Sequence, residues 1–161
     1  MHVAFRPFLQ AGAGYGEECV KHGVHFNHQT DEWPTPQKLF NELNREFDFE
    51  LDVAATAANA KCERFYTKHD SGLDSDWAAR NWCNPPHSQI KKWVLKARRE
   101  QLKGHLTVML LPRRTDTAFF QDSIYNKQNV EVRFIRGRLT FQGAKGQAPF
   151  PSMIVIFRPY A

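Results

Sequence analysis

The stretch 81–90 reads N-W-C-N-P-P-H-S-Q-I and constrains the fold more than any other part of the chain. The apolar pair Trp82-Cys83 precedes two consecutive prolines, and apolar side chains at helical spacing follow Ser88. Each proline fixes φ and removes a backbone donor, and the pair keeps Asn84 out of the helical region. We therefore predict a rigid turn at the carboxyl end of a strand, which is where open α/β sheets bind ligands.

The chemistry available to this turn is specific. The side-chain oxygen of Asn84 would lie beside the free carbonyl of Pro85, giving two oxygen acceptors. Two such acceptors match the two hydrogens of an exocyclic amine on a nucleobase. Accepting both hydrogen bonds localises the nitrogen lone pair and makes a weak aromatic amine nucleophilic. The same residues also fit an ordinary proline-rich loop, so the surrounding sequence has to decide.

Composition places the chain in a broad class. The 161 residues, 42% of them hydrophobic, predict one domain with a proper core. We find no apolar run long enough for a membrane span and no secretory signal pattern. Three cysteines, few and odd in number, favour a reduced intracellular protein. The formal charge of +5 is compatible with a polyanionic partner.

Residues 1–30 differ from the rest of the chain. Glycines alternate with other residues in 11–16, but no helical pattern follows them, so we favour a flexible or loosely docked arm over a nucleotide-binding loop. Four metal-ligand residues then recur every three positions, at Cys19, His22, His25 and His28. Steps of three spread ligands around a helix and no second ligand pair follows, so we predict no metal site.

From residue 31 onward, helical and strand patterns alternate within a single predicted domain, 31–161. Thr35 is the expected N-cap of the first helix and Pro36 its first helical residue. Helices are predicted over 36–47, 88–103 and 116–125, and strands over 47–53, 64–67, 82–83, 105–111, 130–134 and 153–157, with a loop at 142–151. This order predicts an α/β fold: a mostly parallel sheet with an antiparallel C-terminal edge and helices on both faces.

Seven ordered motifs between residues 31 and 157 carry a resemblance to a known family. They are D-E-W-P-T-P at 31–36, L-D-V-A-A-T at 51–56, G-L-D-S-D-W at 72–77, W-C-N-P-P at 82–86, L-L-P-R-R-T-D-T at 110–117, G-R-L-T-F at 137–141, and the closing strand after Ser152. The chain resembles the phage-type DNA N6-adenine methyltransferases, the phage Dam family. The resemblance implies a Rossmann-like methyltransferase fold and S-adenosylmethionine as the cofactor.

The resemblance also implies an enzyme that transfers a methyl group to adenine N6 in DNA, with double-stranded DNA as the expected substrate. It implies a phage or prophage modification enzyme, of the kind found in restriction-modification, acting in the host bacterial cytoplasm. It assigns catalytic roles to Asn84, Pro85, Pro86 and His87, and cofactor contacts to Thr35, Pro36, Asp52, Ala54, Ala55, Leu73, Asp74 and Trp77. Core packing is the alternative for Trp77, and an ordinary strand-end carboxylate is the alternative for Asp52.

Basic residues after the predicted strands are the candidates for DNA contact. They are Arg113, Arg114, Arg136 and Arg138, and phosphate contacts by arginines would make binding depend steeply on salt. The lysine and arginine pairs Lys91-Lys92 and Arg98-Arg99 fit a solvated helix face better.

The sequence departs from the family at His87. The family's turn usually ends in an aromatic residue, most often tyrosine, which stacks on the target base after the base leaves the duplex. An imidazole presents a smaller face and changes charge near neutral pH. This leaves two alternatives open: a catalytically weak or inactive protein that binds nucleic acid or a partner, and a methyltransferase acting on another exocyclic amine, such as cytosine N4 or an RNA base. The target sequence and the oligomeric state are not readable from the chain.

Overall fold

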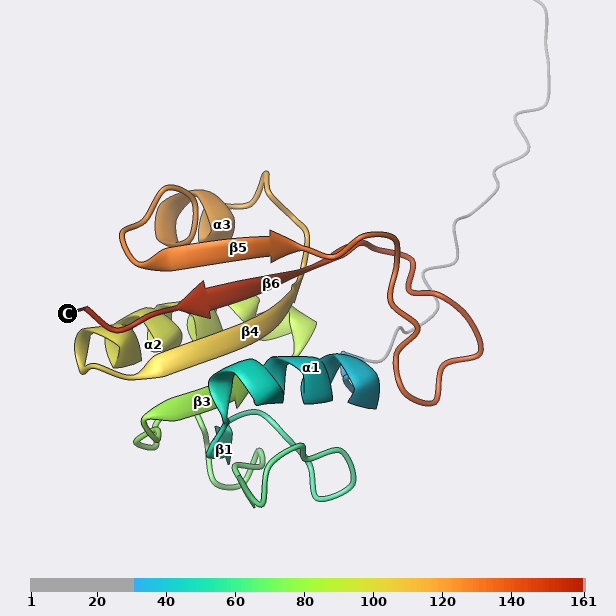
Figure 1. Ribbon diagram of the computed structural model, residues 1–161, viewed down its shortest axis with the longest axis horizontal. Helices are drawn as coiled ribbons and strands as arrows, with labels where there is room; N and C mark the ends of the chain where they lie inside the picture. The colour runs from blue at the N-terminus through green and yellow to red at the C-terminus, as the bar shows by residue number, and fades with distance from the viewer. Residues whose placement is uncertain (1–30, 161) are drawn as a thin grey trace, which may run out of the picture.

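The computed structural model describes residues 31–160, so the predicted arm 1–30 and its Cys19, His22, His25 and His28 lie outside the described residues. The elements, shown in Figure 1, follow in the order α1 (Gln37–Phe47), β1 (Leu51–Asp52), β2 (Arg64–Phe65), β3 (Arg80–Cys83), a 3-10 turn η1 (His87–Gln89), α2 (Ile90–Leu102), β4 (Leu106–Pro112), α3 (Ala118–Ser123), β5 (Val130–Phe134) and β6 (Ser152–Phe157).

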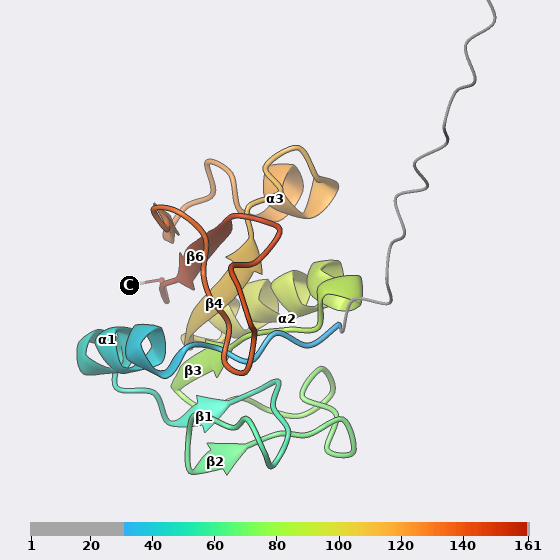
Figure 2. The same ribbon diagram turned by 90° about the vertical axis from the view of Figure 1, so that its right-hand side faces the viewer.

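The strands form one sheet in the order β2-β1-β3-β4-β6-β5. The first four run parallel, whereas β6 is antiparallel to both β4 and β5. The predicted α/β class, with a mostly parallel sheet and an antiparallel C-terminal edge, is therefore confirmed. Because β1, β3, β4 and β5 all run in one direction, their carboxyl ends meet at the same edge of the sheet, which Figure 2 turns toward the viewer.

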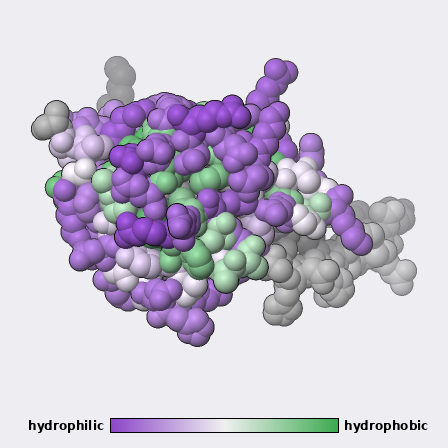
Figure 3. Space-filling model, turned by 60° about the horizontal axis from the view of Figure 1, so that its bottom comes forward, coloured by the Kyte–Doolittle hydropathy of each residue, from purple (hydrophilic) through white to green (hydrophobic). Residues whose placement is uncertain are grey.

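The sheet has a separate hydrophobic core on each face. Side chains of β4 alternate between them: Met109 and Leu111 join the core under α2 and α3, whereas Val108 and Leu110 join the core under α1. This alternation follows from the period of two along a strand. Helices therefore cover both faces, as predicted, and Figure 2 shows α1 on one side with α2 and α3 on the other. The face shown in Figure 3 is largely hydrophilic, with hydrophobic residues in patches between.

The first helix and first strand differ from the sequence prediction. The strand expected over 47–53 is only Leu51–Asp52, because α1 continues through Phe47 and buries that side chain. Asp48 then ends the helix in the left-handed conformation, at φ 51°, and its N–H bonds to the Asn44 carbonyl. Apolar and polar residues alternate after Phe47, but residues 48–50 connect α1 to β1 and do not belong to the strand.

The start of α1 also corrects the prediction. Thr35 makes no side-chain capping bond, and Pro36 occupies the N-cap position at φ −58° and ψ 130° instead of the first helical position. The Thr35 hydroxyl instead accepts a hydrogen bond from the side-chain amide of Asn84, which follows β3. Smaller differences concern α3, which is shorter than the predicted 116–125, and α2, which begins after a 3-10 turn.

Gly72 shows how tightly the chain packs behind the carboxyl edge. A Cβ atom at this position would lie 2.1 Å from the Val53 carbonyl oxygen and 3.0 Å from the Trp93 ring. At Gly146, by contrast, nothing lies within 4 Å of a Cβ atom. The backbone after β1 therefore requires glycine at position 72 for a steric reason.

We expect Gly72→Ala to lower the free energy of unfolding by roughly 1–3 kcal/mol, because overpacking forces the Val53 backbone to shift. Gly146→Ala, the matched control, should change the free energy of unfolding by less than about 0.5 kcal/mol. Urea denaturation of both variants measures the difference. Equal stability of the two variants would show that the backbone at Val53 can shift away from a Cβ atom at position 72 without a cost in free energy.

Candidate active site

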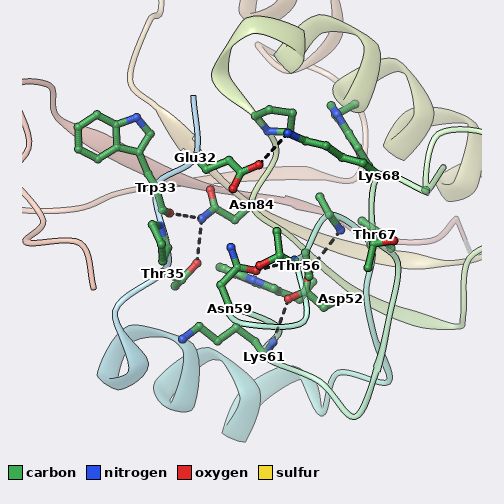
Figure 4. Close-up of a pocket in the computed structure, with 18 of the residues that line it drawn as sticks. Glu32, Trp33, Thr35, Asp52, Thr56, Asn59, Lys61, Thr67, Lys68 and Asn84 are labelled. Atoms are coloured by element: carbon green, nitrogen blue, oxygen red, sulfur yellow. Dashed lines mark hydrogen bonds and ion pairs between the residues drawn. The ribbon is translucent and has the colours of Figure 1, made fainter. Parts of the chain in front are cut away.

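A pocket of about 290 Å³ opens at the carboxyl edge of the sheet, close to the lower end of the size range for small-molecule sites. Its wall comes from four segments: 32–35 before α1, 52–61 after β1, 67–73 before β3, and the turn after β3 with the start of α2. Of the residues proposed from sequence, it is lined by Thr35, Asp52, Ala54, Ala55, Leu73, Asn84 and Pro86. Figure 4 shows the Asn84 amide directed toward Trp33 and Thr35, and Asp52 beside the loop that carries Lys61.

Asn84, at the end of β3, is held in one orientation. Its amide nitrogen donates to the Trp33 carbonyl at 2.5 Å and to the Thr35 hydroxyl at 3.0 Å. A carbonyl oxygen can only accept, so the amide nitrogen rather than the oxygen must face Trp33. The Asn84 side-chain oxygen receives no hydrogen bond from residues 31–160, and Asn84 lines the pocket; Figure 4 shows its nitrogen directed toward Trp33 and Thr35. The site therefore presents one fixed acceptor.

The Pro85 carbonyl, the second acceptor expected from sequence, receives no hydrogen bond from residues 31–160, but Pro85 is buried and does not line the pocket. The N–H groups that could close a tight turn on it bond elsewhere: His87 donates to the Asp31 carbonyl at 3.3 Å and Ser88 to the Asp31 carboxylate at 2.8 Å. Gln89 donates to the Pro86 carbonyl at 3.1 Å. Asp31 thus holds the turn from outside, and its hydrogen bond from the Ser88 hydroxyl lowers the pKa of its carboxyl.

Asp52 shapes the pocket floor. Its buried carboxylate accepts the Lys61 N–H at 3.0 Å and the Ala54 N–H at 3.3 Å, so it fixes the chain on both sides of the 54–61 loop. Burial raises the pKa of this carboxyl to about 6, against the two backbone hydrogen bonds, which favour the charged form. Asp52 is therefore both a carboxylate that binds backbone N–H groups at the end of a strand and a residue of the pocket wall.

His87 does not line the pocket but belongs to an aromatic cluster beside it. Its ring stacks on Trp33 at 6.2 Å between centroids and meets the edge of Phe150 at 5.0 Å. Burial, and then the positive charge of Arg114, lower the pKa of His87 to about 4. The imidazole is consequently neutral at neutral pH, and the change of charge expected from sequence near pH 7 does not occur here.

Three residues proposed as cofactor contacts lie outside the pocket wall. Pro36 starts α1, and Asp74 is exposed and accepts a hydrogen bond from the Ser71 hydroxyl at 2.5 Å. Trp77 is buried, donates to the Gly72 carbonyl at 2.7 Å and stacks on Trp93 at 6.3 Å. Trp77 therefore packs in the core, which was the alternative interpretation of this residue.

Sequence reasoning missed several residues of the pocket wall. Trp33 sits inside the D-E-W-P-T-P motif, and only its position beside Thr35 could have pointed to it. Lys61 donates to the side-chain oxygens of Gln37 and Gln142, at 2.9 and 3.0 Å, and burial lowers its pKa. An ion pair of 2.9 Å joins Lys68 and Glu32 across two of the pocket's segments (Figure 4).

The four candidate arginines lie at the same edge as the pocket. Arg113 and Arg114 follow β4, and Arg136 and Arg138 follow β5, and all four are exposed. The guanidinium of Arg113 lies 5.7 Å from the ring centroid of Phe134, the last residue of β5. Because β4 and β5 run in the same direction, the arginines that follow them lie at the same edge of the sheet as the N-P-P turn after β3.

Among the described residues, no helix combines the length and the apolar character that crossing a membrane requires. Residues 31–160 also hold no group of three or more His, Cys, Asp or Glu side chains that could bind a metal ion.

The sheet, its two cores and the pocket at the carboxyl ends of β1 and β3 define the class: an α/β protein with a methyltransferase-like fold. The chain belongs to the DNA N-6-adenine-methyltransferase (Dam) family, whose model matches residues 24–161. This membership confirms the resemblance and places the chain in a family of enzymes.

Two relatives show how far the similarity extends. The chain is 33% identical over 144 residues to a DNA N-6-adenine-methyltransferase of Haemophilus phage HP1 (strain HP1c1), covering 81% of this chain and 80% of the relative. It is 32% identical over 113 residues to a DNA N-6-adenine-methyltransferase of Escherichia phage T1, covering 68% of this chain and 47% of the relative.

The raised pKa of Asp52 predicts a pH dependence of stability. In the folded protein this carboxyl keeps its proton up to pH 6, whereas in the unfolded chain it releases it near pH 4. The free energy of unfolding should therefore fall as pH rises from about 4 to about 6, by up to roughly 3 kcal/mol from this residue. Asp52→Asn removes that part of the slope.

Chemical denaturation at half-unit pH steps measures this contribution as the difference between wild type and Asp52→Asn. The exposed Asp122 on α3 offers a matched control, because Asp122→Asn should retain the wild-type slope. Identical slopes for wild type and Asp52→Asn would mean that the Asp52 carboxyl titrates as an exposed group.

Proposed function

We propose that this protein transfers a methyl group from S-adenosylmethionine to adenine N6 in DNA. The observation that carries the proposal is the Asn84 side-chain oxygen, which has no hydrogen-bond partner in residues 31–160 and belongs to a pocket that Asp52 and Thr35 also line. The Pro85 carbonyl in the same N-P-P turn likewise accepts no hydrogen bond from the described residues. Family membership supports it, as do relatives named for adenine N6 methylation.

The residues around the pocket fit an amino-acid-like cofactor. Trp33, Leu73 and Trp93 give apolar walls, and Thr56, Asn59 and Thr67 add polar side chains to the same pocket. Small residues at Ala54 and Ala55 let a ligand approach the backbone after β1. When bound, S-adenosylmethionine supplies a methyl group on a positively charged sulfur.

The chain's own contribution is positioning. The Asn84 oxygen and the Pro85 carbonyl accept the two N6 hydrogens, which localises the nitrogen lone pair for attack on the methyl carbon. S-adenosylmethionine, held in the pocket lined by Thr35, Asp52 and Leu73, would supply the methyl group, which would replace one N6 hydrogen, and the displaced proton would leave to solvent. Because Trp33 and Thr35 fix the Asn84 amide, no reorientation is needed when the base arrives.

One observation favours a second candidate, a protein that binds the cofactor and nucleic acid but turns over poorly. The His87 ring is packed between Trp33 and Phe150, so it is not a free stacking face for a flipped base. Base stacking contributes roughly 1–3 kcal/mol, and its loss would slow the reaction about tenfold or more.

We expect Asn84→Ala to lower the rate of adenine methylation by roughly 100-fold or more, because one of the two fixed acceptors is removed. Affinity for S-adenosylmethionine, measured by calorimetric titration, should change far less. Asn41→Ala is the matched control, since Asn41 is an exposed amide on α1 that bonds only to Gln37 among the described residues.

The assay digests unmodified duplex DNA after incubation with labelled cofactor and identifies the methylated nucleoside by mass. N6-methyladenine from wild type supports the proposal, and methylcytosine or methylated RNA alone would transfer it to another amine. Cofactor binding without any methylated nucleoside, across sequences and salt concentrations, would replace it with the second candidate, especially if His87→Tyr then produced N6-methyladenine.

Removing Arg113 and Arg138 together should weaken DNA binding and lower the slope of log affinity against log salt by about one per lost phosphate contact. Lys91→Ala with Lys92→Ala removes the same charge from an exposed helix face and serves as the control. Fluorescence anisotropy at several salt concentrations measures both slopes, and an unchanged slope in the arginine variant would exclude these two residues from the DNA contact.

A further inference from the structure

The longest connection between elements in residues 31–160 joins β5 to β6, and we name residues 135–151 the β5–β6 loop. Loops of this length inside a compact domain are usually functional. It leaves the sheet at the edge that carries the pocket and extends beyond it on the right of Figure 1. The same loop hangs beside the segment before α1 in Figure 2.

The base of this loop is fixed to the candidate active site. Phe141 and Phe150 pack on Trp33 with ring centroids 5.2 and 5.1 Å apart, and Phe150 also meets His87. The Gln142 N–H donates to the Pro34 carbonyl at 2.9 Å, and the Ala148 N–H closes the loop onto the Leu139 carbonyl at 2.7 Å. The loop therefore has a defined position relative to the N-P-P turn.

The tip of the loop, residues 142–147, is exposed throughout. Within the described part of the chain, the side chains of Lys145 and Gln147 form no recorded hydrogen bond or ion pair. Gly143 adopts φ +81°, and neither it nor Gly146 has any atom within 4 Å of a Cβ position. An anchored base with a polar, open tip is what a surface that contacts a large ligand requires, rather than a segment that completes the core.

Two arginines lie at the base of the loop. The Arg113 N–H donates to the Pro151 carbonyl at 2.9 Å, so Arg113 lies beside the last residue of the loop. The Arg138 guanidinium donates to the Ala148 carbonyl at 3.4 Å from inside the loop. Arginines beside a polar loop match duplex DNA, in which phosphates position the protein and base edges specify the sequence.

We propose that Lys145 and Gln147, at the tip of the β5–β6 loop, read bases flanking the target adenine in the groove of duplex DNA. Lysine pairs with guanine acceptors, and glutamine pairs with the donor and acceptor of adenine. The fixed base of the loop sets the distance between the bases read and the adenine held at Asn84. This inference rests on the proposed methyl transfer to adenine in DNA and names the residues that select its target.

The test uses the full chain and a pool of DNA duplexes in which one adenine has randomised flanking bases. After methylation, sequencing that detects N6-methyladenine gives the preference for each flank. We expect wild type to prefer some flanks, and Lys145→Ala with Gln147→Ala to lower that preference about tenfold or move it to other bases, with unchanged affinity for S-adenosylmethionine.

The matched control is Lys127→Ala with Gln128→Ala in the connection from α3 to β5, at the opposite edge of the sheet. This variant should keep the wild-type preference. If the loop variant no longer methylates, selection of bound duplexes from the same pool reports its preference instead: lost selectivity supports the inference and retained selectivity overturns it.

Three other results would overturn the inference while leaving methyl transfer intact. They are an identical preference in wild type and the loop variant, an equal change in the control variant, and a wild type that methylates every flank equally. Absence of N6-methyladenine from wild type in every duplex is different, because it removes the proposed function itself.

Discussion

The arrangement depends on two hydrogen bonds from one amide. The Asn84 nitrogen, directly after β3, donates to the Trp33 carbonyl and the Thr35 hydroxyl. These two residues precede α1 and lie 51 and 49 positions earlier in the chain. These bonds join the D-E-W-P-T-P motif to the N-P-P turn, together with the bonds from His87 and Ser88 to Asp31, and they fix the orientation of the Asn84 amide. The Thr35 hydroxyl that accepts from Asn84 makes no capping bond to α1, whose N-cap is Pro36.

Parallel pairing brings the remaining parts together. Leu51 pairs with Asn81 and Asp52 with Trp82, while Trp82 and Cys83 pair with Val108 and Met109. Segments that follow β1, β3, β4 and β5 must therefore emerge at one edge, and the antiparallel β6 begins at that edge, where Ser152 pairs with Pro112. The sheet needs no second domain to bring a pocket, a rigid turn and several arginines within one surface.

Patterns of local origin were predictable from the sequence, and those set by distant contacts were not. The diproline turn, the buried run of β4 and the alternating β5 follow from spacing and backbone chemistry, and they occur as predicted. The short β1 could not be foreseen, since its length depends on how far α1 packs before Asp48 turns. Lys61 carried no signal at all, because Gln37 and Gln142, its partners, come from separate parts of the chain.

The departure at His87 has a structural counterpart in the same cluster. With its pKa lowered to about 4, a neutral imidazole packs between Trp33 and Phe150 without the cost of burying a charge. A tyrosine there would need space for a larger ring and a partner for its hydroxyl. His87 therefore connects the N-P-P turn to Phe150 at the base of the β5–β6 loop. A nucleobase that enters beside Asn84 would contact Trp33, which lines the same pocket. Any gain from restoring tyrosine must be set against loosening that connection.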